Sequence, residues 1–118
     1  MKVKEMKYVC LLFVCLLLFI IACKKEKKEE AIDCSGVSPS YVSEVKPIVN
    51  ANCLSSGCHN AGSANGDYTT YNGLKAVASS GALESRAVTN KTMPPSGALS
   101  LADRKKIKCW VSSGALNN

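Results

Sequence analysis

The stretch NCLSSGCHN, residues 52–60, constrains this chain more than any other part of its sequence. It contains Cys53, Cys58 and His59, and His59 is the only histidine among 118 residues. Two thiols and an imidazole this close together predict either a bound group or a disulfide bond. The fold therefore has to be one in which these side chains reach a common partner or each other.

Three interpretations of Cys53, Cys58 and His59 are open from these residues alone. In c-type haem attachment, both thiols add to haem vinyl groups and the histidine directly after the second cysteine ligates iron. The gap, Leu54–Gly57, is longer than the usual two residues, but its two serines and its glycine form loops readily. In a zinc site, a further cysteine would be the fourth ligand. In the third interpretation, the two cysteines form a disulfide and His59 is incidental.

The N-terminal segment is expected to direct the chain out of the cytoplasm. Three lysines precede Val9–Ile21, an unbroken apolar run that suits a signal peptide and is too short to span a bilayer. The sequence Ile20-Ile21-Ala22-Cys23 resembles a bacterial lipobox. This implies a lipoprotein signal peptide at 1–22 and a lipid on Cys23 that anchors the chain to a membrane of the cell envelope. The alternatives are an uncleaved anchor and an ordinary signal cut nearby.

A charged tether and a small domain follow the signal peptide. Residues 24–30, KKEKKEE, contain no apolar side chain, so residues 23–31 are interpreted as a lipidated, solvated tether and residues 32–118 as one domain. The net charge of the whole chain is +6. In an envelope protein this favours acidic partners or lipid headgroups, and it gives no reason to propose nucleic acid.

The domain has few large apolar side chains with which to build a core. It lacks phenylalanine, and its aromatic residues are one tryptophan and three tyrosines: Trp110, Tyr41, Tyr68 and Tyr71. So thin a core needs a covalent staple or a cofactor. Besides the two cysteines already described, the domain contains Cys34 and Cys109, the candidates for a fourth zinc ligand. In an oxidising compartment, thiols without a role are not expected to stay unpaired.

Met93 favours the haem interpretation over the other two. It is the only methionine after the signal peptide, and Pro94 and Pro95 follow it. The two prolines are expected to make the backbone at Met93 stiff and extended. A stiff loop can hold a thioether opposite a histidine as the second axial ligand of haem iron. The alternative role of a lone methionine is to fill a gap in the core.

The first helix is predicted within residues 38–53, where apolar residues recur at helical spacing. Ser38 or Ser40 can begin it. Pro47 either kinks this helix or marks its true start, because proline lacks the N–H that a helix interior needs.

Three further helices are predicted, and no segment alternates convincingly as a strand. Two short ones are expected at 71–78 and 82–88, on either side of Gly81. Ser100 and Asp103 are spaced like a capping box at the start of the last helix, and Gly114 is expected to end it. This helix also carries a basic cluster, which is either a solvated face or a docking site for an acidic redox partner: Arg104, Lys105, Lys106 and Lys108.

Four stretches of the chain resemble small monohaem c-type cytochrome domains of bacterial envelope lipoproteins: VKPIVNANC, CLSSGCH, TMPP and ALSLADRKKIKCWVSSGALNN. Together they span most of residues 41–118. The resemblance implies an all-α, cytochrome c-like fold with three to five short helices around one covalent haem c. It implies thioether bonds at Cys53 and Cys58, and iron ligation by His59 and Met93. The four-residue gap between the cysteines departs from the family pattern.

The resemblance also implies that the first and last helices cross. Trp110 would then lie near the first helix, and Cys34 and Cys109 would come close enough to form a disulfide. Such a bond would close a loop of roughly 75 residues and stabilise the domain by up to about 4 kcal/mol.

The expected function is one-electron transfer in the cell envelope with protein redox partners. No acid, base or nucleophile constellation is visible, so the chain is not expected to be an enzyme. One alternative is a haem-based sensor or accessory subunit in which Met93 dissociates from iron. The other is a haem-free, disulfide-stapled envelope lipoprotein.

Overall fold

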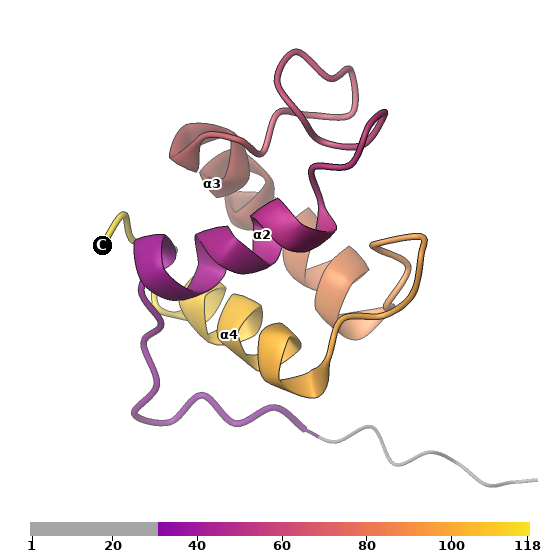
Figure 1. Ribbon diagram of the computed structural model, residues 1–118. Coiled ribbons are helices and arrows are strands. Elements are labelled where there is room, and N and C mark those ends of the chain that lie inside the picture. The colour runs from indigo at the N-terminus through magenta and orange to yellow at the C-terminus, as the bar shows by residue number, and fades with distance from the viewer. Residues whose placement is uncertain (1–30) are drawn as a thin grey trace, which may run out of the picture. The chain divides into compact units, whose positions relative to one another are not determined.

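The computed structural model describes residues 31–118 (Figure 1). These residues contain five short helical segments, joined by loops, and no strand. The all-α prediction is therefore confirmed for these residues. Residues 32–118 form one compact unit. The predicted signal peptide at 1–22, the lipid site at Cys23 and the charged residues 24–30 lie outside the described residues.

The first helical stretch begins at the second of its two candidate serines. The hydroxyl of Ser40 accepts a hydrogen bond from the N–H of Ser43 at 3.3 Å, and η1 (Tyr41–Val45) follows as a π-helical turn. The α-helix α2 (Lys46–Asn52) continues it, with Pro47 in the first turn. Proline is tolerated there because the first N–H groups of an α-helix have no partner within the helix. Pro47 thus marks the start of the α-helical part.

The two middle helices lie close to their predicted positions. The helix α3 spans Tyr71–Ser79, and the hydroxyl of Thr70 caps it by accepting from the N–H of Gly73 at 3.1 Å. Helical residues resume at 82, and η2 (Glu84–Thr89) winds as a π-helix. The π winding was not predicted, because spacing over so few residues does not distinguish it from an α-helix.

The last helix, α4 (Leu101–Ser112), has the predicted cap. The hydroxyl of Ser100 accepts from the N–H of Asp103 at 3.1 Å and donates to the carboxylate of Asp103 at 2.8 Å. Gly114, with φ of +98°, follows the helix end as predicted. The helix buries Ile107, Cys109 and Trp110.

The first helical stretch packs against the last helix, through contacts between η1 and α4 (Figure 1). The Trp110 ring stacks on Tyr41 with centroids 5.7 Å apart, and Tyr71 meets Tyr41 edge-on at 5.1 Å. Trp110 is fully buried, and its indole N–H donates to the carbonyl of Leu116 at 2.8 Å. The prediction that Trp110 lies near the first helix is therefore confirmed.

Cys34 and Cys109 form a disulfide, as the resemblance predicted. Their Cα atoms are 5.2 Å apart and the two residues are separated by 75 positions. Cys109 has no exposed surface. The bond thus ties the segment before the first helix to the buried face of α4.

The basic cluster of α4 is partly paired within the domain. Lys108 lies 3.3 Å from the carboxylate of Glu84, and Lys106 lies 3.9 Å from that of Glu44. These pairs are partly exposed to solvent and add little stability, but they neutralise part of the charge of the cluster. Within residues 31–118, no helix is both long and apolar enough to cross a membrane.

Candidate functional site

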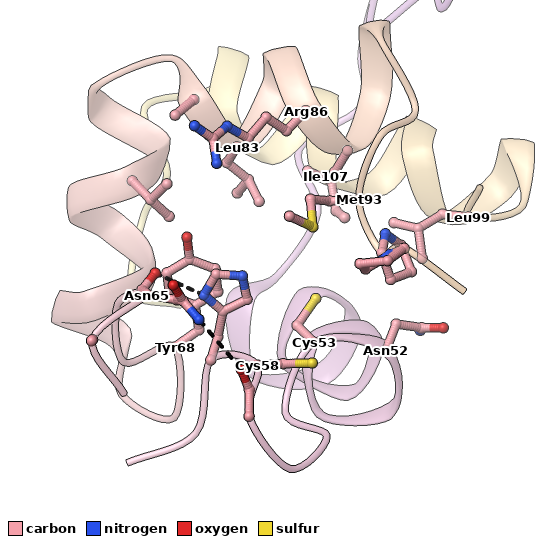
Figure 2. A pocket seen from close by; sticks show the side chains of 18 residues that line it. Asn52, Cys53, Cys58, Asn65, Tyr68, Leu83, Arg86, Met93, Leu99 and Ile107 are labelled. Atoms are coloured by element: carbon pink, nitrogen blue, oxygen red, sulfur yellow. Dashed lines mark hydrogen bonds between the residues drawn. The ribbon is translucent and has the colours of Figure 1, made fainter. Parts of the chain in front are cut away.

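A cavity of about 400 Å³ opens between the loops that follow α2 and η2. Its lining includes all four of the predicted cofactor-binding residues, and it brings Met93 to the motif that contains Cys53, Cys58 and His59. Figure 2 shows Cys53, Cys58 and Met93 around this space. The rest of the lining is largely apolar. It comes from α3, the segment around η2, the loop before α4 and α4 itself, and includes Val77, Leu83, Ala87, Leu99 and Ile107.

The loop between the two cysteines projects the extra residues outward. Cys53 is the C-cap of α2, and its carbonyl accepts the N–H of His59 at 3.0 Å, which closes the loop. A turn inside the loop joins the N–H of Cys58 to the carbonyl of Ser55 at 2.9 Å. Gly57 takes φ of +78°, a conformation that other residues rarely adopt. Both cysteines therefore reach the cavity although four residues separate them.

The imidazole of His59 is oriented by a hydrogen bond at one nitrogen. Its Nδ1 lies 3.0 Å from the backbone carbonyl of Asn65 (Figure 2). A carbonyl can only accept a hydrogen bond, so we assign the proton to Nδ1. Nε2 then keeps its lone pair, which is the tautomer of a metal-ligating histidine whose other nitrogen donates to a carbonyl.

Tyr68 covers the face of the same imidazole. The two rings are 3.9 Å apart between centroids and their planes differ by 7°. Burial raises the pKa of the Tyr68 phenol, and the nearby Cys53 thiol raises it further, while Arg86 acts in the opposite direction. Tyr68 thus stays neutral near physiological pH and presents an uncharged ring to His59.

The loop that carries Met93 is held by the carbonyl of Arg86. This carbonyl accepts the N–H of Thr92 at 2.9 Å and that of Met93 at 3.1 Å. The backbone bends at Met93 and Pro94, so the expectation of an extended chain there is wrong. Figure 2 shows the Met93 thioether and the Cys53 thiol directed into the same space.

The electrostatics of the cavity favour a largely apolar ligand. Among the lining residues, Arg86 is the only one of the Lys, Arg, Asp and Glu types. Burial raises the pKa of the Cys53 thiol, and the neighbouring Cys58 raises it further. Cys53 is therefore a neutral thiol at neutral pH, because its charged form is disfavoured in this environment.

The two rival interpretations of the cysteine motif do not match this geometry. Cys34 and Cys109 are bonded to each other and cannot serve as a fourth zinc ligand. Residues 31–118 contain no group of three His, Cys, Asp or Glu side chains placed to hold a metal ion. Cys53 and Cys58 are free thiols, so the disulfide alternative is not formed either.

Sequence reasoning missed three residues of the site: Asn65, Tyr68 and Arg86. From the sequence, Tyr68 is notable only as one of the few aromatic side chains of the domain. A signal was present, since a tyrosine at the end of a glycine- and asparagine-rich loop can fold back onto the residue that begins it. The sequence contains no comparable signal for Arg86.

Comparisons with known proteins identify no relative of this chain: no protein-family model, no curated protein and no solved structure matches it at a significant level.

Proposed function

We propose that this chain is a cytochrome c-like electron-transfer protein with one covalent haem c. The observation that carries the proposal is the meeting of the lone histidine, the lone methionine of the domain and two free cysteines around one apolar cavity. Zinc and disulfide chemistry do not need the methionine. A bis-ligated haem uses all four side chains.

The residues present fit such a group. The cavity, at about 400 Å³, lies within the range of roughly 300–1,000 Å³ that is typical of cofactor sites. Both thiols are free for thioether bonds, and the exposed Ser55 and Ser56 accommodate the long gap between them. The imidazole is already in the tautomer that leaves Nε2 as a ligand.

Each residue then has a separate role. Cys53 and Cys58 would attach the haem through thioether bonds, and His59 and Met93 would hold its iron. When bound, the haem iron supplies reversible one-electron chemistry. A methionine ligand raises the reduction potential, and the apolar lining excludes water from the iron. If His59 and Met93 both held the iron, they would leave no position for a substrate, so we propose a carrier and not an enzyme.

The proposed location is the cell envelope, on the periplasmic or surface side, with the chain anchored to a membrane by a lipid on Cys23 after removal of residues 1–22. Its partners would be redox proteins of the envelope. The positive net charge favours acidic ones. The ion pairs of Lys106 and Lys108 leave a smaller basic surface on α4 than the sequence suggests. We propose no role for nucleic acid.

The test is covalent haem content. The full chain, expressed together with cytochrome maturation machinery, should give one haem per polypeptide in the pyridine haemochrome assay. Cys58→Ser should abolish normal attachment, and mass spectrometry of Cys53→Ser should show whether one thioether is enough. Ser55→Ala is the matched control, because Ser55 is exposed in the same loop and should keep the haem.

Wild-type protein without covalent haem would end the cytochrome proposal and leave the disulfide-stapled lipoprotein. Carbon monoxide separates the carrier from the sensor. It should change the spectrum of the reduced wild-type protein little and that of Met93→Ala strongly. A large change in the wild type would favour the sensor.

A further inference from the structure

Tyr68 is joined to His59 through both the backbone and the side chain. Its N–H donates to the carbonyl of His59 at 2.8 Å. Its ring lies parallel to the imidazole, within 7° and with centroids 3.9 Å apart. Tyr68 also packs against the hydrophobic core, so the ring has a firm support.

Gly66 allows the Tyr68 ring to lie against its own loop. A Cβ at position 66 would be 3.1 Å from Cε1 of Tyr68, closer than nearly all real contacts of this kind. The φ of Gly66 is +99°, which also favours glycine. A side chain at position 66 would therefore compete with the Tyr68 ring for the space beside the loop, and glycine leaves that space to the ring.

The hydrogen bond between Nδ1 of His59 and the carbonyl of Asn65 does not by itself fix the imidazole plane. The ring is also tethered through its Cβ–Cγ bond, but small coupled changes of the two side-chain torsions can tilt its plane while Nδ1 keeps the hydrogen bond. A parallel ring at 3.9 Å removes this freedom, because any tilt brings the two rings into contact. The hydrogen bond and the stack together define the direction of the Nε2 lone pair.

We propose that Tyr68 is a positioning residue that sets the plane of the His59 imidazole. Its consequence at iron rests on the proposed function, whereas the restraint on the imidazole is a property of the chain alone. Groups that orient a metal ligand tune the metal even though they do not touch it. Tyr68 would therefore influence the reduction potential through the orientation of His59 and not through a bond to the haem.

The restraint can be tested without haem. His59 is the only histidine, so its ring protons are assigned directly in the NMR spectrum of the haem-free full chain. Stacking on Tyr68 should move these resonances upfield of their unfolded positions. Tyr68→Phe keeps the ring and should keep the shift, while Tyr68→Leu should lose it. Unshifted His59 resonances in the wild-type protein would overturn the proposal, even if Tyr68→Leu failed to fold.

The consequence at iron is tested in the haem-loaded protein. Tyr68→Phe should keep the wild-type electron paramagnetic resonance g values, which report the orientation of the imidazole plane. Tyr68→Leu should broaden or shift them. It should also change the relative affinity of His59 for the two oxidation states about threefold to tenfold, a potential shift of about 30 to 59 mV for one electron.

Two failures can be distinguished. If the Tyr68→Leu variant carries covalent haem and keeps the wild-type g values and reduction potential, the positioning role is overturned. The cytochrome proposal would remain intact. Wild-type protein without haem would end the cytochrome proposal, while the NMR result on the imidazole would still decide whether Tyr68 restrains His59.

Discussion

The two sides of this domain use cysteine and aromatic side chains in opposite ways. Where η1 meets α4, Trp110 and Tyr41 fill the interior and Cys109 is bonded to Cys34. Around the cavity, Cys53 and Cys58 remain thiols, and the loops leave about 400 Å³ between apolar side chains. The side where η1 meets α4 is filled by its own side chains, whereas the cavity side leaves space for a ligand.

This difference teaches where the stability of the domain comes from. Filled cores gain from close packing, whereas the atoms that line an empty cavity lose those contacts. The stapled side therefore has to hold the loops of the cavity side in place before any ligand is bound. The C-terminal tail adds to this side, because the side chain of Asn118 accepts the N–H of Tyr41 at 2.9 Å.

Removing each cysteine pair should separate the two sides most clearly. We expect Cys34→Ala/Cys109→Ala to lower the free energy of unfolding of the haem-free protein by about 4 kcal/mol, because the disulfide closes a long loop. The matched pair Cys53→Ala/Cys58→Ala should cost less than about 1 kcal/mol, since neither residue is fully buried. Urea unfolding measures both. Equal losses would mean that the two pairs do not differ as described.

Filling the cavity should sharpen the comparison further. Ala87 is buried and lines the cavity, so Ala87→Leu should stabilise the haem-free protein by about 1 kcal/mol and reduce covalent haem. The control is Ala78→Leu, at a buried alanine that does not line the cavity; overpacking there should destabilise by roughly 1–3 kcal/mol. Thermal unfolding and haem content are the measurements. If Ala87→Leu were as harmful as Ala78→Leu, the space would already be filled.

The smallest expected effect concerns the ionisation of Cys53. Its pKa is raised mainly by burial, so the Cys58→Ala variant should still alkylate at Cys53 with a midpoint above that of an ordinary thiol. The folded state holds this proton more tightly than the unfolded state. The folding stability that the raised Cys53 pKa contributes is therefore complete below the ordinary thiol pKa. It is lost as the pH rises through the raised pKa of the folded state. An alkylation profile with an ordinary midpoint would show that Cys53 is not buried as described.

The helix boundaries were predictable because local chemistry decides them. Ser100 caps α4 through an N–H three residues away, and Gly114 ends it, as the sequence indicated. The bend at Met93 and the attachment of its loop to the carbonyl of Arg86, in another segment, were not predicted. The proline pair indicated a stiff backbone and did not determine its direction.

The candidate ligands were also visible in the sequence, since a single histidine and a single methionine beside two cysteines limit the possible chemistry. Their neighbours were not. Tyr68 reaches His59 only because the loop between them turns back, and a preference for loops does not specify where a loop returns. The spacing of the cysteines did not show which of them bond; the resemblance implied the Cys34–Cys109 pair, and the tertiary structure brings those two residues together. A disulfide requires two Cα atoms within a few ångström, and that distance is set by the packing of η1 against α4.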